Sequence, residues 1–338
     1  MKVRSLYSVN IELTNKCPLH CPQCYCSLEG NKHIDLEIAK SKIKEAAEHG
    51  VQTVNLSGGE TLCYPWLYEL ISYASGLCKQ VNIAISGCFF SEEVLQKLLD
   101  TGVTSVSVSL NGSTKEINSL TRDGYELAIK ALETLGRSKL EQTYINWVMH
   151  TNNCDDFQNV VTIAEKYNIH YIDVIMFKPD ARHELKTFPS GKQMKQIADY
   201  IHFYKGPVRI LVESCFSPLL ALVSNYSWTG NINTGIQKGC GAGMYMYNIS
   251  VDGLYSPCRH LDFCEDYPTL DDYLEKSAYV KKVAGFEGNL RHPCSVCSLE
   301  KFCRPCPAIP IKLYDDVFKG HEPCEIWKLN ISPFPHRN

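Results

Sequence analysis

The sequence predicts an α/β fold: a partial (β/α)6 TIM-like barrel followed by a small cysteine-rich C-terminal domain. Two observations carry this prediction. Short β-rich runs alternate six times with amphipathic helical runs up to about residue 205, which favours a parallel sheet with helices on its outside. After residue 239 long periodic segments are few, and eight of the 17 cysteines lie there, so a domain organised around metal is expected.

Each expected strand is an apolar, β-branched run that a helical stretch follows. These strands are 7–13, 51–57, 81–86, 104–110, 143–150 and 170–177. Helices are expected near 35–49, around 65–78, and from the N-cap Ser91 to a stop at Gly102. The run 205–213 is a candidate seventh strand. The expected domains are therefore the barrel at 1–205, a bridging strand and helix region at 206–239, and the cysteine-rich domain at 240–338.

Composition narrows the class of protein. Hydrophobic content of 44% and charged content of 21% are those of a globular chain, and the net charge of −3 gives no electrostatic reason to expect nucleic acid or an anionic membrane. Asn10 and Glu12 interrupt the N-terminal apolar run, and Glu213 and Pro218 interrupt the most apolar later segment, 208–223. Neither a signal peptide nor a membrane span is expected, so the protein is predicted to be cytoplasmic. Clustered cysteines in a reducing compartment favour metal or redox chemistry.

The first cysteine group has the spacing Cys17-x3-Cys21-x2-Cys24, with Cys26 trailing. It follows the first strand directly, and in parallel sheets the chemistry lies at the carboxyl ends of the strands. Structural zinc sites usually pair two close thiols with two distant ones, so three thiols on one loop are unusual for zinc. Three thiolates suit a 4Fe–4S cluster whose fourth iron stays open to a substrate or cofactor. Zinc remains the alternative for these cysteines alone.

The CxxxCxxC motif after a first strand, followed by "NLSGGET" at 55–61, resembles the radical S-adenosylmethionine (SAM) enzymes. The resemblance implies that the open iron is chelated by the amino and carboxylate groups of SAM. One electron from the cluster then releases a 5′-deoxyadenosyl radical, which abstracts hydrogen from a substrate. The protein supplies position and excludes water.

The same resemblance implies which residues bind SAM. Ser57, Gly58, Gly59 and Glu60 match the stretch that receives the amino group, and Ser86 lies in a turn, "ISGCFF", that stands where relatives have TNG. Ser109 and Asn111 would lie near the ribose and Arg122 near the carboxylate. Two positions depart from the family: Gln23 stands where an aromatic residue is common before the third cysteine, and Asn111 replaces an aspartate. "FKPDAR" at 177–182 resembles the P-x-G-R of many relatives.

The second cysteine group contains two C-x2-C pairs that would indicate zinc if they stood alone. The whole order of seven cysteines resembles the SPASM extension of radical SAM enzymes, which holds two auxiliary 4Fe–4S clusters. This implies an outer cluster on Cys294, Cys297, Cys303 and Cys324, and an inner cluster on Cys240, Cys258 and Cys306. Two fully ligated clusters need eight thiolates. Either Cys264 supplies the eighth, which we prefer, or the inner cluster keeps an open iron.

Most remaining cysteines are expected to be packing residues. Cys215 differs because it follows the candidate seventh strand on the side of the site, where a thiol could donate a hydrogen atom to a substrate radical.

The SPASM resemblance implies chemistry on a peptide, and the leading hypothesis is a crosslink, thioether or other oxidised residue. The alternatives are a peptide epimerase with Cys215 as hydrogen donor, a dehydrogenase or epimerase of a sugar or aminocyclitol, and a non-catalytic Fe–S electron-transfer protein. A reductase such as flavodoxin or ferredoxin is an expected partner. Only sixteen residues precede Cys17, so a peptide substrate is expected to need either a separate peptide-recognition protein as a further partner or direct capture by the mouth of the barrel.

Overall fold

In a computed structural model of the chain, the described residues are 6–26, 30–179, 187–226, 239–286, 288–300 and 303–329. The strands are β1 (Ser8–Glu12), β2 (Thr53–Ser57), β3 (Gln80–Ile85), β4 (Ser105–Ser109), β5 (Thr143–Met149), β6 (Tyr171–Met176), β7 (Arg209–Val212), β8 (Met246–Ile249) and β9 (Tyr255–Ser256). The α-helices are α1 (Leu36–Glu48), α2 (Leu67–Ser75), α3 (Glu92–Asp100), α4 (Lys115–Ser119), α5 (Tyr125–Gly136), α6 (Phe157–Lys166), α7 (Gly191–Phe203), α8 (Ser217–Tyr226), α9 (Leu270–Lys276), α10 (Ala278–Ala284) and α11 (Ala308–Tyr314). The 3-10 turns are η1 (Thr61–Cys63), η2 (Cys154–Asp156), η4 (Cys294–Val296), η6 (Val317–Lys319) and η7 (Glu325–Lys328).

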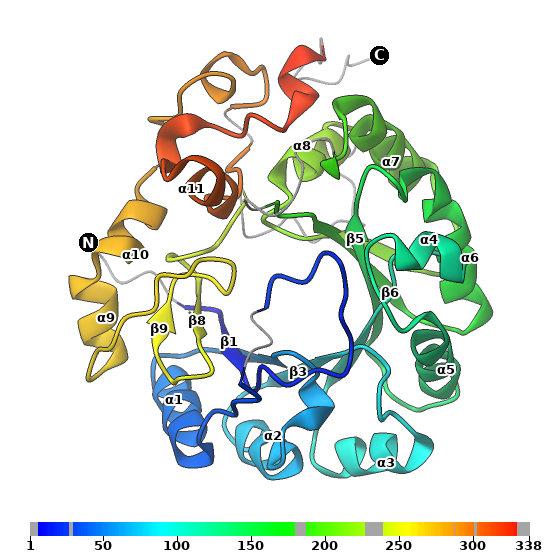
Figure 1. Ribbon diagram of the computed structural model, residues 1–338, viewed down its shortest axis with the longest axis vertical. Coiled ribbons are helices and arrows are strands. Elements are labelled where there is room, and N and C mark those ends of the chain that lie inside the picture. The colour runs from blue at the N-terminus through cyan, green and yellow to red at the C-terminus, as the bar shows by residue number, and fades with distance from the viewer. Residues whose placement is uncertain are drawn as a thin grey trace.

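The strands form one sheet in the order β7-β6-β5-β4-β3-β2-β1-β8-β9, and neighbours from β7 to β8 are parallel. Helices surround the sheet on its outer side, and the loop that follows β1 lies across the middle of the ring (Figure 1). The predicted α/β fold with a partial parallel barrel is confirmed, and the candidate seventh strand is β7. Strand residues that face the helices are buried and apolar, which places the core between sheet and helices.

Helix ends follow the expected local signals. The Ser91 hydroxyl accepts a hydrogen bond from the backbone N–H of Val94 at 3.2 Å, which caps the first turn of α3. Gly102 follows the last turn with φ +88°, a left-handed conformation that glycine adopts at no steric cost.

The inner face of the sheet carries a ladder of side-chain amides that joins neighbouring strands. Asn55 on β2 donates to Asn10 on β1 at 3.0 Å, and Asn82 on β3 donates to Asn55 at 2.9 Å. Ser105 on β4 donates to Asn82 at 2.7 Å. Asn248 on β8 is in register with Asn10 and extends the row. Because each amide bonds only a partner in register, the ladder specifies how these strands pair.

Two of the contacts that attach the cysteine-rich C-terminal region to the barrel lie beside β1 and α1. Strand β8 pairs with β1, and the α9 helix lies against the end of α1. There the Glu45 carboxylate accepts from the Leu270 N–H at 2.5 Å and the His49 ring bonds Asp271 at 3.0 Å. The sheet therefore contains strands from all three of the predicted domain ranges. The division of the chain into these three domains stays a prediction.

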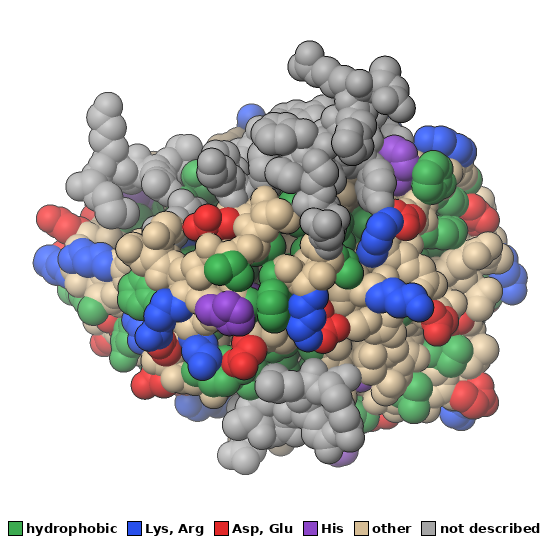
Figure 2. Space-filling model, turned by 90° about the horizontal axis from the view of Figure 1, so that it is seen from above, with side chains coloured by type: hydrophobic (Ala, Val, Ile, Leu, Met, Phe, Trp, Pro, Cys, Tyr) green, Lys and Arg blue, Asp and Glu red, His purple; other side chains and the backbone are tan. Residues whose placement is uncertain are grey.

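Within the described residues, the helices are too short or too polar to cross a bilayer. On the face seen in Figure 2, positive and negative side chains are interspersed and form no patch of a single sign.

Candidate active site

The loop that carries the first cysteines is anchored to the end of β2 by backbone contacts. The Gly59 N–H donates to Thr14 O at 2.6 Å, and the Glu60 N–H donates to Lys16 O at 2.8 Å. A Cβ on Gly58 would overlap the Thr14 carbonyl, and one on Gly59 would overlap the Lys16 carbonyl. Both glycines are therefore needed so that the β2 end can approach the chain just before Cys17.

The far end of the same loop is tied to the segment after β4. The His20 N–H donates to the Asp123 carboxylate at 2.9 Å, and the Gln23 N–H donates to Thr121 O at 3.2 Å. The loop is thus held from two sides over the carboxyl edge of the sheet, where the sequence predicted the site.

Cys17, Cys21 and Cys24 are electrostatic neighbours of one another, and all three are half-buried. Burial raises the pKa of the Cys17 thiol to about 11, and the neighbouring Glu60, Cys21 and Cys24 raise it further. Burial also raises the pKa of Cys21, against which the charge of Arg122 acts. A bound metal would supply the positive charge that three thiolates need.

The buried polar atoms without a hydrogen-bond partner within the described residues include Gln23 Oε1 on this loop and Ser57 Oγ and Arg122 Nε beside it. Ser57 and Arg122 are residues predicted to bind SAM. Arg122 is an electrostatic neighbour of Cys21 and of Glu60, so it lies between the cysteine loop and the β2 end. A buried arginine nitrogen without a partner is costly, and a carboxylate is the ligand that suits it best. The donor set therefore fits an iron–sulfur cluster with SAM beside it.

Other predicted SAM ligands are engaged within the protein. The buried Glu60 carboxylate accepts from the Leu62 N–H at 3.1 Å and from the N–H and hydroxyl of Ser86. Burial raises the pKa of Glu60, while the bonds from Ser86 lower it. Ser109 is half-buried at the end of β4. Residues 180–186, which include most of the "PDAR" segment, lie outside the described residues.

Asn111 is a structural residue in this arrangement. It is 1% exposed, its side-chain Oδ1 accepts from the Val148 N–H at 3.0 Å, and its Nδ2 donates to Thr121 at 2.9 Å. Its backbone carbonyl accepts from Trp147 and Asn153. The side-chain oxygen thus ties the end of β4 to β5, and the side-chain nitrogen ties it to the segment after α4. The second contact uses an amide N–H, which gives a reason for an asparagine where the resemblance implies an aspartate.

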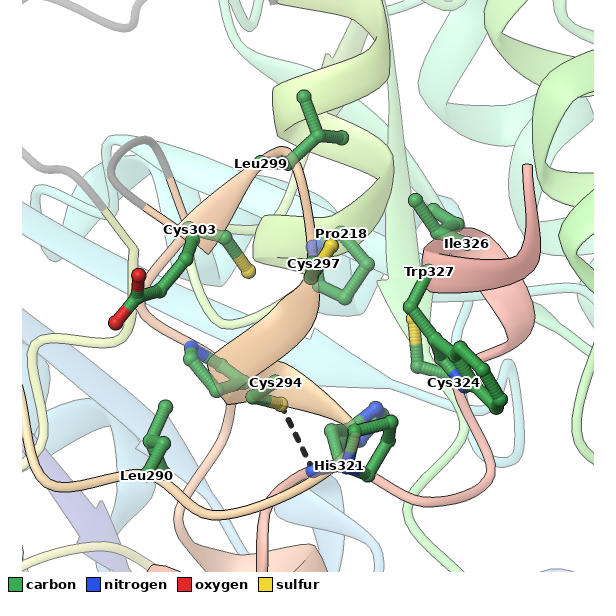
Figure 3. Close-up of a pocket in the computed structure, with 13 residues that line it drawn as sticks. Pro218, Leu290, Cys294, Cys297, Leu299, Cys303, His321, Cys324, Ile326 and Trp327 are labelled. Carbon is green, nitrogen blue, oxygen red and sulfur yellow. Dashed lines mark hydrogen bonds between the residues drawn. The ribbon is translucent and has the colours of Figure 1, made fainter. Parts of the chain in front are cut away.

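The four cysteines predicted for the outer cluster line one pocket, and Figure 3 shows their side chains around a common space. Besides the thiols, the lining is mostly apolar and includes Pro218, Leu290 and Trp327. A dry pocket with four sulfurs fits a fully ligated cluster. The ligand assignment of Cys294, Cys297, Cys303 and Cys324 stays a prediction.

Polar contacts to these outer sulfurs come from two directions. The His321 backbone N–H donates to Cys294 Sγ at 3.1 Å, as the dashed line in Figure 3 marks. The Ser217 hydroxyl at the start of α8 lies 3.1 Å from Cys303 Sγ. Burial lowers the pKa of the His321 ring to about 4, so the ring is neutral at physiological pH. Hydrogen bonds to cluster sulfurs are a means of setting reduction potential.

The cysteines predicted for the inner cluster also meet. Cys240 and Cys306 are hydrogen-bonded through their side chains, and Cys258 is an electrostatic neighbour of Cys240. Cys264 is exposed. In the described part of the chain, three or more His, Cys, Asp or Glu side chains do not converge on a point suited to a single metal ion. A cubane cluster makes no such demand, because each thiolate binds a different iron.

Sequence reasoning missed a buried ion pair at the carboxyl ends of β6 and β7. Lys178 Nζ bonds Glu213 at 3.0 Å, and the lysine side chain is 4% exposed. It also missed a contact that joins the first cysteine loop to the inner cysteines. The Tyr25 ring packs on His260 at 4.3 Å, and the Arg259 guanidinium donates to its hydroxyl at 3.3 Å. The available signal for the Lys178–Glu213 pair was that both residues stand at the end of a predicted strand or just after it.

Comparison with known proteins agrees with this geometry. Residues 11–164 match the model of the Radical SAM superfamily. The AdoMet-dependent heme synthase of Methanosarcina barkeri is 22% identical over 88% of this chain and 90% of its own length. The mycofactocin maturase MftC of Mycobacterium tuberculosis is 28% identical over 73% of this chain, and the match spans 63% of that maturase.

Solved structures share the fold. Streptococcus suis SuiB bound to precursor peptide SuiA matches 94% of this chain and 76% of its own, with a TM-score of 0.74 and 17% identity. The anSMEcpe structure with bound AdoMet and the Cp18Cys peptide matches 92% of both chains, with a TM-score of 0.70 and 18% identity.

Proposed function

We propose that this chain, a radical SAM enzyme that uses S-adenosylmethionine and an iron–sulfur cluster, modifies a peptide by net oxidation. The one observation that carries the proposal is the site at the carboxyl edge of the barrel. There three half-buried thiols on a doubly anchored loop stand beside the unpartnered Ser57 Oγ and Arg122 Nε, within the described residues. A pure electron carrier needs a fourth thiolate at that cluster and has no use for the buried polar atoms.

Within this proposal Cys17, Cys21 and Cys24 bind the cluster and Arg122 holds the SAM carboxylate. The backbone after β2, with Ser57, Gly58, Gly59 and Glu60, orients the amino group, and Ser86, Ser109 and Asn111 shape the wall beside it. When bound, the cluster and SAM supply hydrogen-atom abstraction by a 5′-deoxyadenosyl radical. The barrel keeps water away from the reacting carbon.

The net change on the peptide is the loss of two hydrogens. One would leave as a hydrogen atom to the 5′-deoxyadenosyl radical, which becomes 5′-deoxyadenosine. The second would leave as a proton when the new bond closes, and an auxiliary Fe–S cluster would take up the remaining electron. Reduced flavodoxin or ferredoxin would supply the electron that the SAM cluster needs for each turnover.

Support for a peptide substrate comes from the relatives. MftC and the PqqA peptide cyclase of Bradyrhizobium diazoefficiens, which is 28% identical over 46% of this chain, are peptide-modifying by name. The SuiB and anSMEcpe structures hold peptides by title. A separate recognition protein that delivers the peptide is part of the proposal.

The first test is reductive SAM cleavage by the anaerobically reconstituted protein. With dithionite or reduced flavodoxin we expect 5′-deoxyadenosine and methionine in equal amounts. Without any 5′-deoxyadenosine the proposal fails. The second test is coexpression with short peptides encoded beside the gene, followed by mass spectrometry. The expected product is lighter by two hydrogens, with the change confined to one residue or one crosslinked pair.

A small-molecule substrate is the second candidate, because the heme synthase match covers most of both chains. It is favoured if SAM cleavage proceeds while none of the coexpressed peptides changes in mass.

A further inference from the structure

The inner cysteine group has a fourth thiol nearby, and it is not the one that the sequence suggested. Cys215 lies between β7 and α8, 25 positions before Cys240, 43 before Cys258 and 91 before Cys306, and is 7% exposed. Its side chain is hydrogen-bonded to the Cys306 thiol. Cys306 in turn is hydrogen-bonded to Cys240, and Cys258 is an electrostatic neighbour of both Cys215 and Cys240. Four thiols from four separate segments therefore share one buried place.

Backbone contacts hold these segments together. The Cys240 N–H donates to Arg304 O at 3.2 Å, which aligns the first inner cysteine with the turn that carries Cys306. On the other side the Ser217 hydroxyl, two residues after Cys215, lies 3.1 Å from Cys303 Sγ. The start of α8 thus lies between the inner and outer thiols, so the position of Cys215 follows from the fold and does not depend on one side-chain rotamer.

A buried ion pair lies beside these thiols. The Lys178 ammonium is an electrostatic neighbour of Cys215 and Cys306, and its partner Glu213 is also hydrogen-bonded to Cys215. A cluster bound by four thiolates is an anion, and a buried anion needs a cation or hydrogen-bond donors near it. Lys178 is the cation available there, and Glu213 offsets part of its charge.

Cys264 has none of these features. It is exposed, its side chain is hydrogen-bonded to Ser250, and the charged groups around it are the carboxylates Glu12, Asp262 and Asp252. A thiolate among carboxylates at the surface is disfavoured, and the carboxylates oppose an anionic cluster.

We propose that Cys215 is the fourth thiolate of the inner auxiliary cluster, with Cys240, Cys258 and Cys306, and that Cys264 is not a ligand. The inference rests on the auxiliary clusters of the proposed function. It also removes Cys215 as a hydrogen donor, because a thiolate bound to iron has no S–H hydrogen to give. The inner cluster is then closed, which suits electron transfer and excludes direct binding of substrate to its iron.

The experiment uses the full chain with Cys17, Cys21 and Cys24 replaced by alanine, so that only auxiliary clusters contribute iron. Cys215→Ala and Cys264→Ala are added separately, and each protein is reconstituted anaerobically with iron and sulfide. Iron per chain and the EPR spectrum of the dithionite-reduced protein are measured, without SAM or peptide.

The background protein and the Cys264→Ala variant should hold about eight irons per chain and give the same spectrum. Cys215→Ala should fall towards about four irons, or keep its iron with a changed spectrum of one cluster. The proposal is overturned if Cys215→Ala matches the background in both measurements, or if Cys264→Ala shows the loss instead.

Loss of both clusters in Cys215→Ala could result either from a missing ligand or from misfolding of the variant. Cys215→Gly with added 2-mercaptoethanol distinguishes the two, because the external thiol can replace the missing ligand. An external thiol that restores the background spectrum supports ligation, whereas failure to restore it overturns the proposal. Peptide modification plays no part in these readouts, so a wrong peptide assignment leaves them untouched. A background protein that binds no iron would refute the auxiliary clusters themselves.

Discussion

The cysteine loop after β1 and the inner group around Cys306 differ in access. The thiols of Cys17, Cys21 and Cys24 are half-buried on a loop fixed by backbone bonds at both ends. Cys215 and Cys306 are 7% and 2% exposed and come from distant segments. An iron that must bind a cofactor needs three ligands and an open side, whereas an iron that passes electrons gains from a fourth ligand and burial. The difference in burial is the one expected from the tasks proposed for the two groups.

The largest effect on SAM cleavage is expected when one cysteine of the more accessible group, Cys17, Cys21 and Cys24, is removed. Cys21→Ala should reduce 5′-deoxyadenosine formation to the level without enzyme, because the cluster loses one of three ligands. Cys26→Ala, on the same loop, is the matched control and should retain most of the activity, since Cys26 is outside the proposed ligand set. The measurement is chromatography of the anaerobic reaction. Equal losses in both variants would mean that the loop holds the cluster through a different set.

A second variant tests the backbone contacts that hold the cysteine loop, rather than its thiols. Gly59→Ala places a Cβ against the Lys16 carbonyl and should destabilise the fold by about 3 kcal/mol, with lower SAM cleavage. Gly76→Ala is the control, because its Cβ would be 3.5 Å from the nearest atom, an ordinary contact. That change should stay within about 0.5 kcal/mol. Urea unfolding measures the stability of both variants. A Gly59→Ala variant as stable as the parent protein would show that the loop can move to accommodate the added Cβ.

The amide ladder beneath the loop should matter next. Asn55→Leu leaves Asn10 without its donor and Asn82 without its acceptor, which should cost about 2 kcal/mol in unfolding free energy. Asn55→Asp keeps an acceptor for Asn82 and should cost less at pH 7. If the leucine variant is as stable as the parent protein, the ladder does not hold the strands in register.

The smallest expected effect is at the join between the barrel and the cysteine-rich region. Burial lowers the pKa of His49, but bonds to the Glu45 carbonyl and to Asp271 raise it, and the net shift is upward. The raised value means that the stabilisation is complete below about pH 6.5 and is lost as pH rises through the folded-state pKa. Because the Asp271 side chain is exposed to solvent, at most about 0.5 kcal/mol is expected. Urea midpoints of the parent protein and of His49→Gln should differ below pH 6 and converge above pH 8.

Much of the barrel follows from local signals in the sequence. The six predicted strands match β1 to β6 within a few residues, because each is an apolar run closed by a turn or cap. The tripeptides Val9-Asn10-Ile11, Val54-Asn55-Leu56 and Val81-Asn82-Ile83 each place an amide between two apolar residues, which is the sequence signal of the amide ladder.

The parts that sequence could not predict depend on distant pairing. That β8 lies beside β1 is set by tertiary packing, for which no local signal exists. The choice between Cys215 and Cys264 is of the same kind. Cys264 is nearer to the other cysteines in sequence, but the return of the chain past β7 brings Cys215 nearer in space. Spacing motifs identify ligands that share a loop and miss one that comes from another segment.

The pairing of Ser8 with Met246 has a consequence for synthesis of the chain. One edge of β1 has no partner until the ribosome has made β8, which at cellular rates takes on the order of ten seconds or more. During this time the nascent chain presents an open strand edge that invites wrong pairing. A chaperone on that edge would protect it during this interval, which is set by the rate of translation. Yield on expression should therefore respond to growth temperature and to the supply of chaperones.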